Sequence, residues 1–254
     1  MLMITTATSR ETQELTKFLH HIGNGEQGEA EAMLLAKPQL ATLSGDLTDC
    51  ADRKFEKITG FQYSIWALDY HMWAMIKKYL NTEEAQAQVA GLNSGAAESY
   101  ETQISWNSLI VALDTYVKNY DVWDWNQCNN YWCQQVGGAQ LMLPAHVINE
   151  YSYPSRPLYP CSKWNGQAEP NLPRTGVKNW RKSGSYKLGY TFAWCRANLE
   201  CLEAFNFKDH EYFITKAGAF YDHEALRAYL NARTEQAQAL VSELTLRPGS
   251  TPRP

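Results

Sequence analysis

Apolar residues in the first third of the chain recur at three- and four-residue spacing, which predicts amphipathic helices. The first helix is expected over residues 9–23, where Leu15, Phe18 and Ile22 share one helical face. Residues 42–57 are instead polar and irregular, so we expect a projecting loop there. Further short helices are expected over residues 29–37, 59–68, 71–80 and 83–90.

The second half of the chain contains the strongest amphipathic pattern, over residues 106–120, and we expect the core helix of a second layer there. A helix over residues 122–135 should follow and should end at Gly137–Gly138, because glycine breaks helices. Trp125 and Trp132 are seven residues apart, so we expect them to share one buried face of that helix.

The last third of the chain is interrupted by prolines, which favour irregular structure between residues 154 and 173. Residues 185–196 alternate loosely between polar and apolar, and they are the one region for which we expect a strand. Pro144 should begin a helix at its first turn, and Asp222 should cap the final helix.

Together these elements predict a mainly α-helical protein with a Pro-rich, partly extended basic segment. We expect an N-terminal helical region over residues 1–95 and a C-terminal helical region over residues 96–247. The C-terminal region carries a Pro-rich basic insertion at residues 152–200. We expect the N-terminal helical hairpin to pack on the second helical layer, and residues 248–254 to form a disordered tail.

Hydrophobic residues make up 44% of the chain and charged residues 20%, the composition of an ordinary globular protein. No apolar run reaches the roughly 18 residues required to span a bilayer, and the first residues lack the basic and apolar regions of a signal peptide. The six cysteines are spread over the whole chain, unlike those of a small disulfide scaffold. We therefore expect reduced thiols and a cytoplasmic protein.

The net charge of -4 is unevenly distributed along the chain. Residues 152–200 contain eight basic and two acidic side chains, a local charge of +6, and several of the basic residues lie next to aromatic ones. Such a segment can bind phosphate groups or an acidic protein surface, and it can equally be the internal complement of the acidic remainder. The candidate binding residues are Lys163, Trp164, Trp180, Arg181, Lys182 and Lys187.

Cys133 and His146 allow a catalytic interpretation, in which an imidazole removes the proton of a nucleophilic thiol. Glu150 lies four residues after His146 on the same helical face, where it would orient the ring. The alternative is that Cys133 packs as a small apolar residue in an aromatic-rich helix. The chain has no phosphate-binding glycine loop, no Gly-x-Ser-x-Gly and no His-Glu-x-x-His motif, and we expect no metal and no cofactor.

Residues 59–62 (Thr-Gly-Phe-Gln) follow the polar loop and begin the first of two paired helices. They lie where ankyrin repeats carry Thr-Pro-Leu-His, and residues 75–80 lie where those repeats have a leucine-rich second helix. Leu68 and Asp69 replace the Gly-His pair of such repeats. Residues 28–80 therefore resemble a degenerate ankyrin-like helical hairpin, which would have to pack on the rest of the chain.

A second resemblance covers residues 25–200 and rests on the order of their motifs. A tryptophan-rich helix follows the ankyrin-like hairpin, and after it come residues 136–140 (Val-Gly-Gly-Ala-Gln), residues 143–151 (Leu-Pro-Ala-His-Val-Ile-Asn-Glu-Tyr) and residues 172–174 (Leu-Pro-Arg). This order resembles uncharacterised proteins of intracellular bacterial pathogens, some of them suspected effectors delivered by type IV secretion. The resemblance implies a host cytosol, reached without a cleaved signal peptide, and it implies no chemistry for any residue.

These observations lead to three hypotheses. The first is an effector-like protein–protein interaction module with a host protein as its partner, binding through residues 42–57 and the basic aromatic segment. The second is a cysteine-dependent hydrolase or transferase that uses Cys133 and His146. The third is a phosphate-bearing ligand, either an anionic lipid at a peripheral membrane contact or, less in keeping with the negative net charge, a nucleic acid. We expect the first.

Overall fold

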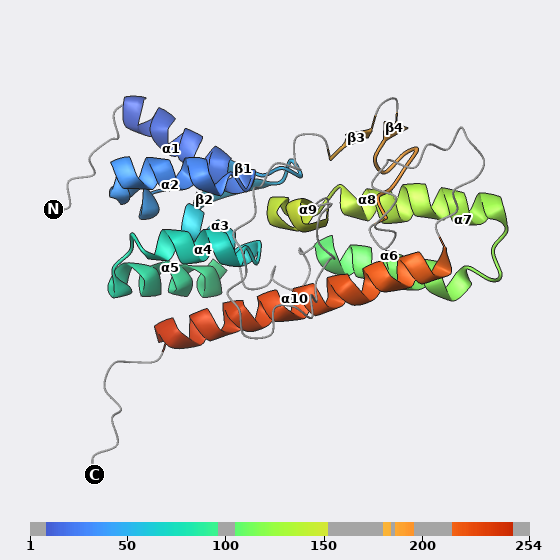
Figure 1. Ribbon diagram of the computed structural model, residues 1–254. Helices are drawn as coiled ribbons and strands as arrows, with labels where there is room; N and C mark the ends of the chain where they lie inside the picture. The colour runs from blue at the N-terminus through green and yellow to red at the C-terminus, as the bar shows by residue number, and fades with distance from the viewer. Residues whose placement is uncertain (1–8, 96–104, 152–179, 184–185, 196–214, 246–254) are drawn as a thin grey trace, which may run out of the picture. The chain divides into compact units, whose positions relative to one another are not determined.

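The computed structural model describes residues 9–95, 105–151, 180–183, 186–195 and 215–245 (Figure 1). Most of these residues are helical, which confirms the predicted mainly α-helical fold. The chain forms two compact units, the first from residues 1–102 and 233–254 and the second from residues 103–232. The predicted tail and most of the predicted insertion at residues 152–200 lie outside the described residues.

The first unit begins with two helices that pack on each other and continues through a short hairpin into three more helices. The helix predicted over residues 9–23 is confirmed, and Phe18, Leu19 and Ile22 on its apolar face are at most 2% exposed. The elements are α1 (Ser9–Gly23), α2 (Gln27–Ala36), η1 (Pro38–Ala41), β1 (Ser44–Thr48), β2 (Lys54–Thr59), α3 (Gly60–Trp66), α4 (Tyr70–Lys77) and α5 (Thr82–Gly95).

Strands β1 and β2 form an antiparallel hairpin, so the prediction of an irregular projecting loop over residues 42–57 is wrong. Ser44 pairs with Thr59, and Leu47 pairs with Phe55. The hairpin escaped the sequence analysis because Leu47 alone is buried in β1, so the strand lacks the apolar alternation that reveals a strand in a sequence. Strand structure is therefore not confined to residues 185–196, as we had expected.

Helices α3 and α4 confirm the predicted helical pair. Thr59 and Gln62 form a capping box at the start of α3, in which each side chain accepts a hydrogen bond from the other residue's backbone N–H at 3.1 Å. Asp69 caps α4 by accepting a hydrogen bond from the backbone N–H of Met72 at 3.2 Å. Between the helices, Leu68 adopts the left-handed conformation with φ of 58°. These local interactions set the start of both helices and the turn between them.

The second unit contains a helical layer and a small hairpin. The predicted core helix over residues 106–120 is confirmed, with Leu109, Leu113 and Tyr116 at most 2% exposed. The predicted strand region is confirmed in part, because β4 covers two of its residues and the rest of its described length is turn and coil apart from an isolated β-bridge between Leu188 and Phe192. The elements are α6 (Ser105–Asn119), α7 (Trp125–Tyr131), the π-helical turn η3 (Trp132–Val136), α8 (Gly137–Gln140), α9 (Ala145–Tyr151), β3 (Lys182–Ser183), β4 (Tyr186–Lys187) and the first part of α10 (Lys216–Thr245).

Residues 125–140 are helical throughout, so the predicted break at Gly137–Gly138 is wrong. Gly137 lies where the backbone of another segment approaches the helix. A Cβ atom at this position would be 2.7 Å from the carbonyl oxygen of Phe192 and 2.8 Å from the nitrogen of Gly189. Glycine is therefore needed here for close packing, and it does not end the helix.

The two tryptophans of this helix do not share a buried face, which corrects the predicted core stripe. Trp132 is 1% exposed, whereas Trp125 is 43% exposed. Trp125 is the first residue of α7, next to the capping residue Asp124, whereas Trp132 follows the last residue of α7. Seven-residue spacing therefore does not by itself bury both rings.

Helix α10 begins at Lys216, so the prediction that Asp222 caps it is wrong. Thr215 has this role, because its hydroxyl accepts a hydrogen bond from the backbone N–H of Gly218 at 3.0 Å. Asp222 is 1% exposed and accepts a hydrogen bond from the Tyr151 hydroxyl. Figure 1 draws α10 as one continuous helix, and its residues 233–245 belong to the first unit.

The predicted boundary between the two regions lies close to the boundary between the two compact units. We predicted a boundary after residue 95, and the division falls after Thr102. Within the described ranges, no helix is both long and apolar enough to cross a membrane, and even the 30-residue α10 carries charged side chains along its length.

Candidate functional site

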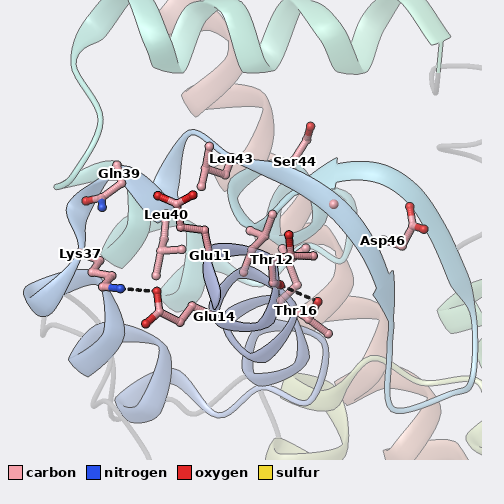
Figure 2. Close-up of a pocket in the computed structure, with 13 residues that line it drawn as sticks. Glu11, Thr12, Glu14, Thr16, Lys37, Gln39, Leu40, Leu43, Ser44 and Asp46 are labelled. Atoms are coloured by element: carbon pink, nitrogen blue, oxygen red, sulfur yellow. Dashed lines mark hydrogen bonds and ion pairs between the residues drawn. The ribbon is translucent and has the colours of Figure 1, made fainter. Parts of the chain in front are cut away.

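A pocket of about 740 Å³ opens in the first unit between α1, the η1 turn and β1 (Figure 2). Helix α1 forms one wall with six residues between Glu11 and Leu19. The η1 region contributes residues from Lys37 to Leu43, and β1 contributes residues 44–46. The volume lies in the range of about 300–1,000 Å³ that is typical of ligand pockets.

The floor of the pocket is apolar because leucines of several elements meet there. Leu15 and Leu19 come from the apolar face of α1, and Leu40 comes from η1. Leu19 and Leu40 are 1% and 3% exposed, so packing holds both side chains in place. Leu43 is 39% exposed and remains available for contact with a ligand.

Gly45 sets the distance between β1 and α1. A Cβ atom at Gly45 would lie 3.1 Å from Cδ1 of Leu19 and 3.2 Å from Cδ2 of Leu15. These distances are tighter than ordinary van der Waals contact, so a larger residue would push the strand away from the helix or displace the two leucines. The shape of the pocket therefore depends on a glycine at this position.

One side of the rim carries a compensated charge cluster. The Lys37 ammonium group hydrogen-bonds the Glu14 carboxylate, as Figure 2 shows, and Nε of Arg10 lies 3.5 Å from the same carboxylate. The hydrogen bond from Lys37, together with the charges of Lys37 and Arg10, lowers the pKa of Glu14 below its ordinary value. Glu14 is therefore ionised at neutral pH and already has cationic partners.

The other acidic groups of the rim lie on α1 and β1. Glu11 and Asp46 are both exposed, and Asp46 accepts a hydrogen bond from the backbone N–H of Lys57 at 3.2 Å. Among the described residues, Asp46 makes no ion pair. The pocket thus combines an apolar floor with a rim on which an acidic side chain is open to an external cation.

The lining of this pocket consists of aliphatic, hydroxyl, amide and charged side chains. The described residues that line it include neither histidine nor cysteine, and the single lysine among them is paired with Glu14. An apolar floor can bury a side chain of a partner, and an unpaired carboxylate can attract a cation. The residues offer no thiol or imidazole for nucleophilic catalysis.

The predicted catalytic residues lie in the second unit. Cys133 is in η3, buried, and its thiol contacts Oδ1 of Asn129 at 3.8 Å. His146 is buried in α9, and its Nδ1 atom lies 3.2 Å from the hydroxyl oxygen of Tyr229. Glu150 is buried on the same helix. No hydrogen bond joins the Cys133 thiol to the His146 ring in the part of the chain described here.

The environment of Cys133 also opposes ionisation. Burial raises the pKa of the Cys133 thiol from its ordinary value of 9.0 to about 12. A nucleophilic cysteine requires a shift in the opposite direction, because the thiolate is the reactive form. The geometry is that of a packed cysteine, the alternative that the sequence left open.

The residues of the predicted basic aromatic surface differ in their exposure, and two of them are not described by the structure. Lys163 and Trp164 lie outside the described residues, and Lys182 is in β3. Arg181 is half-buried. Lys187 is exposed, and its ammonium nitrogen lies 4.1 Å from the centre of the Tyr190 ring. Lys187 is therefore placed as a surface residue.

The prediction that Trp180 is a binding residue is wrong, because its side chain is 2% exposed and its ring is not available to a surface ligand. The ring stacks on Trp194, with ring centres 5.2 Å apart and an angle of 8° between the planes. The indole N–H of Trp180 donates to the carbonyl oxygen of Gln140 at 3.2 Å. The Gln140 side chain in turn pairs with the backbone of Trp194 through two hydrogen bonds of 2.8 Å. Trp180 belongs to a buried structural network.

The sequence predicted only part of the pocket as a binding surface. The predicted binding segment, residues 42–57, includes Leu43 and Asp46, but Lys37 and the residues of α1 were not singled out. None of these side chains has a distinctive chemistry. The available signal was an apolar residue and a glycine, Leu43 and Gly45, inside an otherwise polar stretch.

Comparisons with known proteins place the chain in a family. No solved structure matches the chain. The uncharacterised protein CBUA0006 of Coxiella burnetii (strain RSA 493 / Nine Mile phase I) is 37% identical to it, over 62% of this chain and 52% of that protein. The chain therefore spans about half the length of the curated relative that it matches. The model of the CBUA0006 C-terminal domain matches residues 108–244, more than half of the sequence, and so the chain belongs to the CBUA0006 C-terminal domain family.

Proposed function

We propose that the protein is a protein–protein interaction module that binds its partner through the pocket of the first unit and the adjoining β1–β2 hairpin. The pocket itself carries this proposal. It presents a partly exposed leucine, Leu43, beside a floor of packed leucines, and the acidic rim next to it includes Asp46. Interfaces of proteins commonly join a small apolar centre to a polar rim in this way.

The binding energy of such a site comes from a few anchoring contacts. Fully burying an exposed leucine stabilises a complex by about 1.5–3 kcal/mol. Leu43 is 39% exposed, so burying the remainder of its surface contributes a corresponding fraction of that range, about 0.6–1.2 kcal/mol. The partner's own apolar side chain would add a comparable amount when it enters the pocket.

The ankyrin-like character of residues 28–80 is part of the same proposal. A β-hairpin precedes the helical pair, and the Thr59–Gln62 capping box lies at the start motif of the resembled repeat. Leu68 has a left-handed backbone at the position where the repeat carries glycine. These features support a degenerate ankyrin-like unit. Such units serve as binding scaffolds, and superposing an experimental structure of residues 28–80 on an ankyrin repeat would test the assignment.

The effector-like role and the host cytosol also belong to the proposal. A relative from Coxiella burnetii fits the resemblance to pathogen proteins. The thiol-dependent alternative has less support, because the pKa of Cys133 is raised and its thiol contacts Asn129. Delivery by type IV secretion can be tested by translocation of a reporter fused to the full chain.

Capture from a host-cell extract tests the interaction surface. We would compare the proteins retained by the tagged wild-type chain with those retained by the Leu43→Ser variant. The matched control is Leu35→Ser, since Leu35 is 71% exposed on α2 of the same unit and does not line the pocket. We expect at least one protein that is retained by the wild type and by the control, and whose retention by Leu43→Ser is about tenfold lower.

A second variant separates this surface from the predicted basic segment. Lys187→Glu reverses the charge of an exposed residue in the second unit. Partners of the pocket should be retained normally by this variant. If Leu43→Ser retains the same proteins in the same amounts as the wild type, the pocket is not the interaction surface. If only Lys187→Glu lowers the retention of partner proteins, the interaction surface is the basic segment.

A further inference from the structure

We infer that the pocket between α1, η1 and β1 takes a linear segment of a partner protein in which an aliphatic side chain lies next to a lysine or arginine. This inference rests on the proposed function and adds the chemical class of the partner. Three features of the pocket carry it: the apolar floor, the uncompensated rim charge and the strand that forms one wall.

The floor selects an aliphatic side chain. Leu15, Leu19 and Leu40 line it, and Leu43 stands beside it with 39% of its surface exposed. The leucine side chains of the floor contain no hydrogen-bond donor or acceptor for a polar ligand. A small polar molecule would therefore lose its contacts with water without finding partners, whereas an aliphatic side chain loses nothing.

The rim selects a cation beside the aliphatic group. Glu14 is already paired with Lys37 and Arg10, so an incoming cation gains little there. Asp46 makes no ion pair among the described residues and lies on the β1 wall of the same pocket. A lysine or arginine of the partner can therefore reach Asp46 while its aliphatic neighbour fills the floor.

The charge of the whole first unit favours the same partner. Its residues, 1–102 and 233–254, include 11 basic and 16 acidic side chains, a net charge of -5. Such a field accelerates the encounter with a cationic segment. It opposes the approach of an anionic ligand, such as a phosphorylated peptide or an anionic lipid headgroup. The pocket is thus suited to a basic peptide and unsuited to a phosphate.

The wall formed by β1 favours an extended backbone. Among the described residues, β1 pairs with β2 and with no other strand, so its second edge has no strand partner. Ser44, Gly45 and Asp46 of this strand line the pocket. An extended segment can pair with an open strand edge while alternate side chains enter a neighbouring pocket. Gly45 keeps one face of this strand close to the leucines of α1.

A random dodecapeptide phage library panned against the full-length chain tests this inference. We expect the enriched peptides to carry Lys or Arg within two positions of Leu, Ile, Val or Met. One enriched peptide, labelled with fluorescein, is then titrated by fluorescence polarisation. Its Kd should rise when the salt concentration is raised from 50 to 500 mM, because a charge pair at an exposed rim is screened by salt.

Two pairs of variants locate the bound peptide. Asp46→Asn removes the rim charge but keeps an oxygen that can accept from Lys57, and it should weaken binding by about fivefold. The charge-matched control is Glu83→Gln, an exposed residue of α5 in the same unit. Leu43→Ser should weaken binding by about tenfold, whereas the control Leu35→Ser should leave it unchanged. Circular dichroism of each variant confirms that the helices remain intact.

The outcomes separate the two proposals. Peptides that are sensitive to Leu43→Ser, but are not enriched in basic residues and do not respond to Asp46→Asn, overturn the partner class and leave the proposed function standing. Peptides that bind Leu43→Ser as tightly as the wild type show that this pocket is not the binding site, and they overturn both proposals. If the library yields no enriched peptide, the inference of a linear segment is overturned, and the capture experiment alone decides the proposed function.

Discussion

Asp49 is the residue on which the turn of the β1–β2 hairpin depends. It is 3% exposed, and its carboxylate accepts hydrogen bonds from the backbone N–H groups of Ala51 at 2.9 Å and Arg53 at 3.0 Å. The guanidinium Nε of Arg53 donates to it at 2.7 Å, and the Tyr63 hydroxyl donates to it at 3.2 Å. One buried carboxylate thus ties the turn to α3.

Replacing Asp49 should therefore cost far more stability than replacing a neighbouring acid. Asp49→Ala leaves the half-buried Arg53 cation without its carboxylate, and we expect the free energy of unfolding to fall by about 3–5 kcal/mol. The measurement is urea denaturation followed by circular dichroism. Asp52→Asn is the control, because Asp52 is exposed with φ of 63° and asparagine tolerates that conformation. Equal effects of the two substitutions would contradict the role assigned to Asp49.

The second residue-scale prediction concerns the protonation of Cys133. Its pKa is raised to about 12 by burial, so the thiol keeps its proton at pH 7 to 9 and is a poor nucleophile there. In the folded protein, we expect iodoacetamide to label Cys50, which is partly exposed, and to leave Cys133 unlabelled. Labelling of Cys133 should rise as the pH approaches the raised pKa, or on addition of denaturant.

Peptide mass spectrometry across this pH range provides the measurement. Fast labelling of Cys133 in the folded protein near pH 7 would show that its thiolate is stabilised. That result would revive the thiol-dependent alternative, with His146 as the group to substitute next.

At the scale of elements, Gly137 and Gly138 have different roles although they are adjacent. A Cβ atom at Gly137 would meet backbone atoms at 2.7 and 2.8 Å, whereas a Cβ atom at Gly138 would meet nothing within 4 Å. We expect Gly137→Ala to lower stability by about 1–3 kcal/mol through overpacking. Gly138→Ala should raise stability by about 0.5–1 kcal/mol, because alanine is the better helix former.

Thermal unfolding of the two alanine variants checks this opposition. The pair is well matched, since both positions are in α8 and both substitutions add one methyl group. No effect of Gly137→Ala would show that the segment at residues 189–193 does not pack closely on α8, and destabilisation by Gly138→Ala would show that the space beside Gly138 is not open.

At the scale of the whole molecule, α10 takes part in both units. Residues 216–232 of this helix belong to the second unit, where Leu226 and Tyr229 are buried. Residues 233–245 belong to the first unit, where the Arg233 guanidinium lies 5.6 Å from the centre of the Tyr70 ring. Lys77 also pairs with Glu243 at 2.8 Å. The stability of one helix is therefore linked to two cores.

Hydrogen exchange can resolve these two halves. Leu240→Ala should speed amide exchange in α4 and in residues 233–245, because it removes buried apolar surface from the first unit. Leu226→Ala should speed exchange in α9 and in residues 216–232. If either substitution speeds exchange equally over the whole helix and both units, the two units unfold together. The division of the chain into two compact units would then not be a division into independent units of unfolding.

The sequence by itself determined the helices, because their signals are local. The apolar spacing that predicted α1 and α6 depends on residues within one or two turns of each other. The caps at Thr59 and Asp69 likewise involve residues three positions apart. For these elements the tertiary structure had only to bury faces that the chain already presented.

Only the tertiary structure decided the hairpin, the role of Gly137 and the environment of Asp222, because each depends on residues far away in the chain. The β1–β2 pairing buries only Leu47 from β1 and therefore leaves no alternation to read. Gly137 is required by the backbone at Phe192, and Asp222 is held by Tyr151. The pocket likewise arises where α1 and β1 approach each other, and no spacing along the sequence encodes that distance.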